Sequence, residues 1–154
     1  WRMFAHRVRI AGLDRDSELD MYDPITGVLT DFKTAGDWRW DQLNDWGPEW
    51  ETWEQVLLYG LAMEDEGYPV KTLRLVYVKR CNGHDEVYEI PFDRAAAEAA
   101  RDRLLGHAES LDRGEPLPKT GTGPSTDAGG VEPRLQLVRV HPEVRIGAQD
   151  VPPP

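Results

Sequence analysis

The chain is poor in cysteine, short of positive charge and without a long hydrophobic run. Its single cysteine, Cys81, excludes an internal disulfide framework and a four-cysteine iron–sulfur cluster. It also fits a reducing compartment, so we expect a cytoplasmic protein. No apolar stretch approaches the length of a membrane span, and no signal-peptide pattern opens the chain. The sequence therefore predicts neither a disulfide-rich secreted domain nor a membrane partner.

The shortage of positive charge bears most directly on function. The formal net charge is −10, from 28 acidic and 18 basic side chains. Residues 113–154 carry five of each sign, so the whole acidic excess lies in residues 1–112. Such a chain does not bind nucleic acid through its overall charge, and we expect any DNA binding to be weak and sensitive to salt.

The chain does contain enough apolar residues for one domain with a core. Of its 154 residues, 40% are hydrophobic and 30% are charged, as in soluble globular proteins. We expect residues 1–112 to form an α/β domain. Residues 113–154 are rich in Pro and Gly and predict a linker and C-terminal tail, with one short strand at residues 135–140.

Residues 17–34 organise the rest of the chain and predict two short strands joined by a tight turn. Residues 23–27 (DPITG) supply the turn, because Pro fixes one φ angle and Gly tolerates a positive one. A turn centred on Ile25 and Thr26 fixes the register. The facing pairs are then Asp20 with Asp31, Glu18 with Lys33, and Leu19 with Phe32. Alternation along the strands places one set of side chains on one face (Glu18, Asp20, Asp31, Lys33) and a second set on the other (Leu19, Met21, Thr30, Phe32).

Two facing carboxylates require an explanation. Directly opposed side chains have Cβ atoms about 5 Å apart, and like charges there destabilise a sheet. Either one carboxyl stays protonated or a cation sits between the two, and oxygen ligands beside a solvated opening favour Mg²⁺. Lys33 lies two residues along the same face, where it could orient or help to deprotonate a metal-bound water. The hairpin therefore predicts metal-assisted hydrolysis of a phosphodiester.

This arrangement resembles the PD-(D/E)XK nucleases, in which a strand Asp is followed by a turn and by Asp-x-Lys on the next strand. The segment GVLTDFKTAG (residues 27–36) is similar to the RecB-like exonuclease branch of that superfamily. That branch carries Gln-x-x-x-Tyr on the following helix, matched here by Gln55 and Tyr59. The motifs cover residues 17–60, and the element order stays similar to about residue 112. The resemblance implies a restriction-endonuclease-like core, with a mixed central sheet flanked by helices.

The resemblance also implies an activity, the cleavage of DNA by an exonuclease that requires Mg²⁺ or Mn²⁺. Asp20, Asp31 and the backbone carbonyl of Phe32 would be the metal ligands. Lys33 would position the attacking water and stabilise charge that develops on the phosphate. Glu18 would be an outer ligand or a salt-bridge partner of Lys33.

The Gln-x-x-x-Tyr pair lies on a helix that we expect from about residue 49 to residue 66. One apolar stripe follows the helical repeat (Trp50, Trp53, Leu57, Leu61). Gln55 and Tyr59 are four residues apart and share the opposite face. The resemblance implies that they orient Lys33 or the DNA strand, whereas simple solvent exposure is the alternative explanation.

Five tryptophans fall within sixteen residues before and at the start of this helix (Trp38, Trp40, Trp46, Trp50, Trp53). We expect Trp38 and Trp40 in a loop after the Asp-x-Lys strand. Exposed aromatic rings stack on unpaired bases, so we predict that Trp38 and Trp40, together with Tyr59, contact DNA. The alternative is that the tryptophans cover the sheet edge and pack as core.

The second half of the domain predicts a hairpin and a long helix. Residues 70–79 and 86–90 read as strands connected through Asn82-Gly83. Asp93 caps a helix that runs to about residue 112. An apolar stripe on that helix is expected to pack on the sheet (Ala97, Ala100, Leu104, Ala108, Leu111). Three arginines lie off the stripe and either meet phosphates or form a solvated face (Arg94, Arg101, Arg103).

Two features depart from the resembled fold. That fold starts with a helix that often supplies an acidic or histidine site residue, whereas residues 2–11 predict a strand in which His6 packs. The second departure is the net charge of −10. Two alternatives therefore stay open: a non-catalytic acidic interaction module or inactive nuclease-fold subunit, and a site completed by a further domain or subunit.

Overall fold

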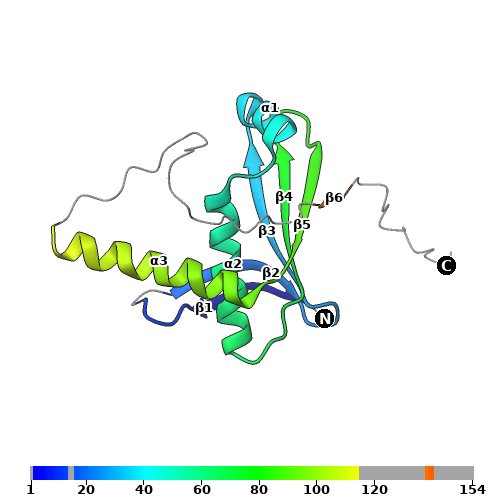
Figure 1. Cartoon of the computed structure of the whole chain (residues 1–154). Helices are drawn as coiled ribbons and strands as arrows, with labels where there is room; N and C mark the ends of the chain where they lie inside the picture. Colours follow the sequence, from blue (N-terminus) through cyan, green and yellow to red (C-terminus); the bar gives the residue numbers. More distant parts are fainter. Residues whose placement is uncertain (1, 14–15, 115–137, 141–154) are drawn as a thin grey trace.

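The fold is a mixed α/β arrangement, given by a computed structural model that describes residues 2–13 and 16–114 and, for the backbone alone, residues 138–140. One six-stranded sheet contains the strands in chain order, and three helices accompany it within the described residues (Figure 1). The strands are β1 (Met3–Arg9), β2 (Asp16–Asp23), β3 (Val28–Ala35), β4 (Thr72–Lys79), β5 (Asp85–Pro91) and β6 (Val138–Val140). The helices are α1 (Asp37–Trp46), α2 (Trp50–Asp65) and α3 (Arg94–Asp112). The predicted class, a mixed sheet with helices, is confirmed.

The Asp-x-Lys strand β3 lies inside the sheet, between β2 and β4. It pairs with β4 in parallel along its whole length, from Val28 opposite Thr72 to Ala35 opposite Lys79. The other neighbouring pairs of the described sheet are antiparallel. Parallel neighbours need a crossover connection, which α1 and α2 supply here. Because β4 fixes every residue of β3, the site residues on that strand have a rigid base.

The β1–β2 pair lies along α2. In β1, buried and exposed residues alternate as the sequence predicts. Val8 and Ile10 of the β1 region are buried while Arg7 is exposed, as the alternation at residues 2–11 indicates. His6 packs edge-on against Tyr68, with its Nε2 atom 2.9 Å from a carboxylate oxygen of Glu66. His6 thus holds β1 to the end of α2.

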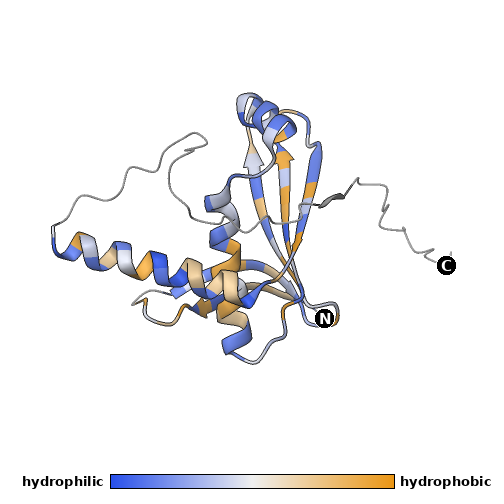
Figure 2. Cartoon of the chain, viewed as in Figure 1, coloured by the Kyte–Doolittle hydropathy of each residue, from blue (hydrophilic) through white to orange (hydrophobic). Residues whose placement is uncertain are grey.

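Helix α2 forms the centre of the core and matches the helix predicted at residues 49–66. It contacts β1, β3 and β4 on one side and α3 on the other, and it carries much of the apolar colour in Figure 2. It is consequently buried almost all round (Trp53, Val56, Leu57, Leu58, Tyr59, Gly60, Leu61, Ala62, Met63). The predicted stripe accounts for only part of this buried surface, since α3 covers a second face.

Helix α3 begins at its predicted cap, because the Asp93 carboxylate accepts two backbone N–H groups of the first turn. Ala97 and Ala100 are buried, but Leu104 and Leu111 are 37% and 56% exposed. The prediction that this stripe packs on the sheet is wrong. The helix crosses α2 instead, and its C-terminal half extends beyond that contact (Figure 1).

Two connections show how turn residues and helix formation decide local structure. Gly27 adopts a φ angle of 73° in the β2–β3 turn, where its N–H group donates to the carbonyl of Asp23 over 2.8 Å. The loop predicted for Trp38 and Trp40 is instead helix α1. Trp40 and Leu43, three residues apart, are buried and hold α1 against the rest of the domain.

Of the segment predicted as linker and tail, the described part is residues 113–114 and 138–140. The latter residues form β6, in which Val140 lies opposite Val87 of β5, so the strand expected at residues 135–140 is present there. The remaining positions of the predicted linker and tail lie outside the described residues.

None of the helices in the described ranges combines the length and hydrophobicity needed to cross a bilayer.

Candidate functional site

Strand β3 places Asp31 and Lys33 together on the face of the sheet that α2 covers. Asp31 is 4% exposed, and its neighbour in register on β4, Leu75, is fully buried. The Nζ atom of Lys33 lies 2.9 Å from the Oδ2 atom of Asp31. The two residues form an ion pair at the edge of the core, on one face as the alternation predicts.

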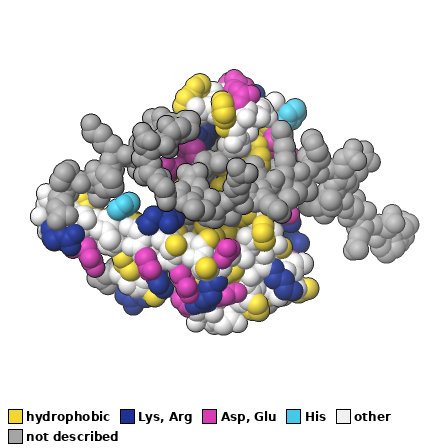
Figure 3. All heavy atoms as spheres, in the orientation of Figure 1, with side chains coloured by type: hydrophobic (Ala, Val, Ile, Leu, Met, Phe, Trp, Pro, Cys, Tyr) yellow, Lys and Arg dark blue, Asp and Glu magenta, His cyan; other side chains and the backbone are white. Residues whose placement is uncertain are grey.

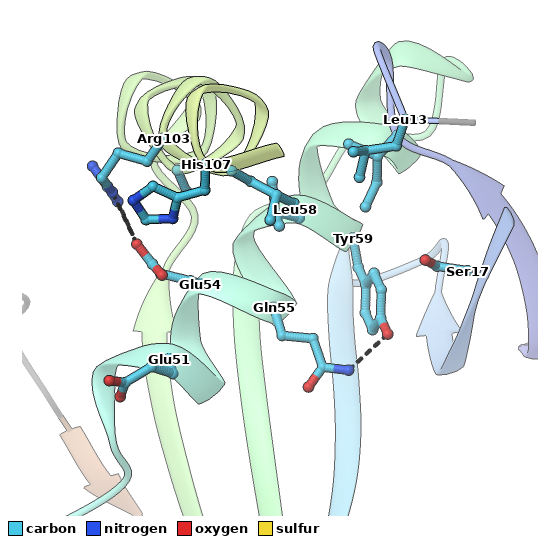
Figure 4. A pocket seen from close by; sticks show the side chains of 12 residues that line it. Leu13, Ser17, Glu51, Glu54, Gln55, Leu58, Tyr59, Arg103 and His107 are labelled. Carbon is cyan, nitrogen blue, oxygen red and sulfur yellow. Dashed lines mark hydrogen bonds and ion pairs between the residues drawn. The ribbon is translucent and has the colours of Figure 1, made fainter. Parts of the chain in front are cut away.

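Helix α2 extends this pair with the two residues of the Gln-x-x-x-Tyr motif. Lys33 Nζ donates to Gln55 Oε1 over 3.0 Å, and Gln55 Nε2 donates to the Tyr59 hydroxyl over 2.7 Å (Figure 4). An ammonium group only donates, so the amide oxygen of Gln55 must face Lys33 and its NH₂ group must face Tyr59. The Tyr59 hydroxyl accepts there, which leaves its own proton for another acceptor. Asp31, Lys33, Gln55 and Tyr59 therefore form one chain of polar contacts, which we call the Lys33 relay.

Asp20 contacts strand β3 through its side chain and not through a backbone ladder. The β2–β3 ladder has the predicted register but joins only residues 21–23 to residues 28–30. Where the backbone ladder ends, Oδ2 of Asp20 accepts from the N–H group of Phe32 over 2.7 Å. The N–H and C=O groups of a strand residue point to the same neighbouring strand. The carbonyl of Phe32 therefore points to the side of β3 on which Asp20 lies.

The predicted continuation of this ladder is wrong. Glu18, predicted opposite Lys33, lies opposite Arg7 of β1 and is exposed. Leu19, predicted opposite Phe32, lies opposite His6 and is fully buried. The pairing of Asp20 with Asp31 in a backbone ladder is likewise not formed. The reason is that β2 leaves β3 at this point and continues along β1.

A local distortion accompanies this departure. Leu19 and Tyr22 are both fully buried although they are three residues apart, so the alternation of faces is interrupted between them. On β1 the interruption falls at Ala5, whose φ angle is 48°. Ala5 is the one residue other than glycine with a positive φ angle in the described ranges. Asp20 lies in the matching part of β2, so the bend in the strand sets the direction of its side chain.

The two aspartates have different environments. Asp20 is exposed, whereas burial raises the pKa of the Asp31 carboxyl above its ordinary range. The Lys33 ammonium opposes this increase, and the negative charge of Asp20 adds to it. Asp31 Oδ2 has Lys33 as its ionic partner but no aligned hydrogen bond within the described ranges. The Asp31 carboxylate is thus buried with less compensation than its charge requires.

These donors are of the chemical type that a small divalent cation takes. Mg²⁺ takes one or two carboxylates and keeps several water ligands. Asp20, which is exposed, the Phe32 carbonyl and the buried Asp31 offer hard oxygen atoms. No cluster of three or more His, Cys, Asp or Glu side chains occurs in the described part of the chain, so an ion here would depend on these three groups and on water.

A cavity on the far side of Gln55 and Tyr59 was not foreseen from the sequence. It lies between α2, α3 and the entry into β2, and has a volume of about 380 Å³ (Figure 4). Its polar lining includes residues that had no predicted role (Ser17, Glu51, Glu54, His107). A signal was present, since Glu51, Gln55 and Tyr59 follow one another at intervals of four residues.

The arginines of α3 hold acidic side chains. Arg94 pairs with three carboxylates (Glu64, Asp65, Glu98), and Arg101 pairs with Asp102. Arg103 lies 2.5 Å from Glu54 of α2. These ion pairs favour the expectation that the three arginines form a solvated face over the expectation that they meet phosphates.

The two tryptophans predicted to contact DNA differ in burial. Trp38 is 74% exposed on α1, whereas Trp40 is 9% exposed, with Lys79 Nζ 5.8 Å from its ring centre. The packing alternative therefore applies to Trp40. Trp46, at the end of α1, is 85% exposed, so α1 presents two aromatic rings to solvent, at Trp38 and Trp46.

No protein-family profile matches the chain, and no curated protein matches it. The geometry of the site is therefore the ground on which a function can be assigned.

Proposed function

We propose that this chain is a Mg²⁺- or Mn²⁺-dependent nuclease that hydrolyses DNA phosphodiesters in the cytoplasm, of exonuclease type and with a restriction-endonuclease-like core. The observation that carries the proposal is the Lys33 relay beside Asp20. An ordinary surface hairpin would leave Lys33 in solvent, whereas here Asp31 and Gln55 both bind its ammonium group. The order of β2, β3, α2 and β4 is also the order on which the resemblance rests.

The proposal gives each residue of the site a role. Asp20, Asp31 and the Phe32 carbonyl would hold the metal ion. The ion would stabilise negative charge on a phosphate oxygen and make a bound water more acidic. Lys33 supplies a positive charge whose position Asp31 and Gln55 fix in advance, which is the kind of preorganisation that lowers a barrier.

Tyr59 acts on Lys33 through Gln55. Its hydroxyl accepts from the amide group and so keeps the amide oxygen turned toward the ammonium. In this proposal Gln55 and Tyr59 are positioning residues, and Lys33 is the group that meets the phosphate.

Incubation of the full chain with linear DNA and Mn²⁺ or Mg²⁺ tests the proposal. Cleavage is expected to stop with a chelator and to fall about 100-fold or more in Asp31→Asn and Lys33→Met, because each removes a charge from the reacting centre. Asp45→Asn is the matched control, since Asp45 is an exposed aspartate on α1. Cleavage that survives both site substitutions would remove Asp31 and Lys33 from the mechanism.

The alternative function is that of a non-catalytic acidic module, or of an inactive nuclease-fold subunit. It is favoured by the net charge of −10 and by strand β1, which precedes β2 where the resembled fold has a helix. Under this alternative, neither metal supports cleavage, and the chain instead binds a basic partner with an affinity that falls as salt increases.

A further inference from the structure

The cavity beside the Lys33 relay is a formed pocket. Its volume of about 380 Å³ lies near the lower end of the range of small-molecule sites, about 300–1,000 Å³. Apolar side chains from the β1–β2 connection, α2 and α3 contribute much of its lining (Ile10, Leu13, Leu58, Leu104). The pocket is thus large enough for one planar organic group.

At the edge of this pocket, the Tyr59 hydroxyl group has no hydrogen-bond acceptor among the described residues. Tyr59 is 8% exposed and lines the pocket. Its hydroxyl oxygen accepts from Gln55, whose orientation Lys33 fixes, so the Tyr59 proton must point elsewhere. A carbonyl or ring nitrogen in the pocket could accept that proton.

The charges around the pocket decide which kind of ligand fits. Glu51 and Glu54 come from α2, and Arg103 from α3 is already paired with Glu54. Within the described lining, a phosphate would therefore meet the Glu51 carboxylate, which has no ion pair with a described residue, and no unpaired arginine. An uncharged aromatic group with polar edges is not repelled by Glu51 and does not need an arginine partner. A nucleobase has this chemistry.

The pocket is also connected to the reacting centre. Gln55 lines the pocket (Figure 4) and also binds Lys33, so one side chain contacts both places. A strand whose phosphate meets Lys33 can therefore place a neighbouring base on the other side of Gln55.

We propose that this pocket receives one unpaired nucleoside unit of the DNA strand, with its base on the apolar lining and its phosphate outside, toward Lys33. The inference rests on the proposed nuclease function, since that function brings a DNA strand to Lys33. The pocket makes the protein selective for single strands and frayed ends, because a base inside a duplex cannot enter it.

A binding experiment without divalent ions tests the pocket separately from cleavage. The probe is the deoxyriboside of 2-aminopurine, an uncharged fluorescent nucleoside that the net charge of the protein does not repel. We expect its emission to change on titration with the full chain. Leu104→Trp, which fills the pocket, should weaken binding about tenfold or more. Leu111→Trp is the matched control, because Leu111 is exposed on the same helix and does not line the pocket.

Cleavage of matched substrates then tests selectivity. The wild-type protein should degrade a single strand about tenfold faster than the blunt duplex of the same sequence. Leu104→Trp should lose this preference, and Leu111→Trp should keep it as the wild type does. Thermal melts of both variants verify that they fold.

The outcomes separate the two proposals. Nucleoside binding that Leu104→Trp abolishes, in a protein that cleaves no DNA with either metal, would support the pocket and overturn the nuclease. Cleavage that depends on Asp31 and Lys33, with no nucleoside binding or with equal binding in the two tryptophan variants, would overturn the pocket and leave the nuclease.

Discussion

At the scale of single residues, the site depends on two aspartates that differ in burial. Asp31 lies at the edge of the core with Lys33 as its ionic partner, whereas Asp20 is exposed and accepts from a backbone N–H group. A buried carboxylate with one partner is costly when it is charged. A positive ion near both aspartates would lower that cost, so stability and metal binding should be linked at this site.

The pH dependence of stability tests the burial of Asp31. Burial raises its pKa above the ordinary value of 3.8, so the folded protein binds this proton more tightly than the unfolded chain does. The free energy of unfolding should therefore fall as pH rises from 3.8 through the folded-state pKa. Asp31→Asn cannot ionise and lacks this loss. Urea titrations without divalent ions measure this. The free energy of unfolding of the variant, minus that of the wild type, should increase across that pH interval and stay constant above it.

The pKa of Asp23 is shifted in the opposite direction to that of Asp31, so Asp23 serves as the comparison. Hydrogen bonds from the backbone at Ile25 and Thr26 lower the pKa of Asp23. Asp23→Asn should therefore lose stability relative to the wild type as pH rises through the folded-state pKa toward 3.8, and the difference should vanish in more acidic solution. A stability difference for Asp31→Asn that does not vary with pH, or that has the sign expected for Asp23→Asn, would contradict the burial of a charged Asp31.

Thermal unfolding tests the metal site. Mg²⁺ that binds only the folded protein adds about 2.7 kcal/mol at a concentration 100-fold above its Kd, which corresponds to several degrees in Tm. Asp20→Asn should abolish this increase, because Asn lacks the charge that the ion requires. Asp45→Asn, on the exposed surface of α1, should keep it. A full Mg²⁺ shift in Asp20→Asn would place the ion elsewhere.

At the scale of helices and strands, local chemistry made much of the fold predictable. The turn at Gly27 and the cap at Asp93 depend on neighbours within a few residues, and both are present as predicted. The end of the β2–β3 ladder could not be predicted, because it depends on the pairing of β2 with β1 and on a side chain, Asp20, that replaces a backbone acceptor.

The site shows the same division between local and long-range causes. The spacing of Gln55 and Tyr59 placed them on one face of α2, but the helical repeat alone did not show that this face points at Lys33, which only the resemblance implied. The pocket arises where α3 crosses α2. How α3 crosses α2 depends on the packed shapes of both helices, so the sequence did not predict the crossing. For the same reason it did not predict that Glu51 and His107 line the pocket.

A glycine tests how closely α2 approaches its neighbours. A Cβ atom at Gly60 would lie 2.7 and 2.9 Å from two ring atoms of Phe92 and 3.3 Å from Leu73. Gly60→Ala should therefore destabilise the protein by about 1–3 kcal/mol, even though alanine is the better helix former. It should also lower the cleavage rate, because a shift of α2 moves Gln55 away from Lys33.

Gly106 of α3 is the matched control for this substitution. No atom lies within 4 Å of a Cβ built there, so Gly106→Ala should stabilise the protein by about 0.5–1 kcal/mol. Urea titrations measure both changes. If Gly60→Ala were as stabilising as Gly106→Ala, α2 would not be held tightly against Phe92 and Leu73.

At the scale of the whole molecule, charge opposes the proposed substrate. On the face seen in Figure 3, acidic and basic side chains are interspersed, and the coloured, described part of that face shows no continuous basic patch. The pairing of Arg94, Arg101 and Arg103 with acidic side chains has the same consequence. DNA binding should therefore depend on the metal ion and on Lys33, and the remaining surface should repel the substrate over a distance that salt shortens.

Charge reversal away from the site tests this repulsion. Asp85 and Asp112 are exposed aspartates outside the Lys33 relay, and replacing both with Lys changes the net charge from −10 to −6. The KM for DNA should fall severalfold at about 50 mM salt, with kcat unchanged, because the reversal acts on the encounter and leaves the reacting centre intact. The advantage should be small at about 200 mM salt, where the Debye length is shorter.

The double Asn variant controls for the loss of the two carboxylates and should show about half of the effect. An acidic interaction module would respond in the opposite direction, since the same reversal would weaken its binding to a basic partner.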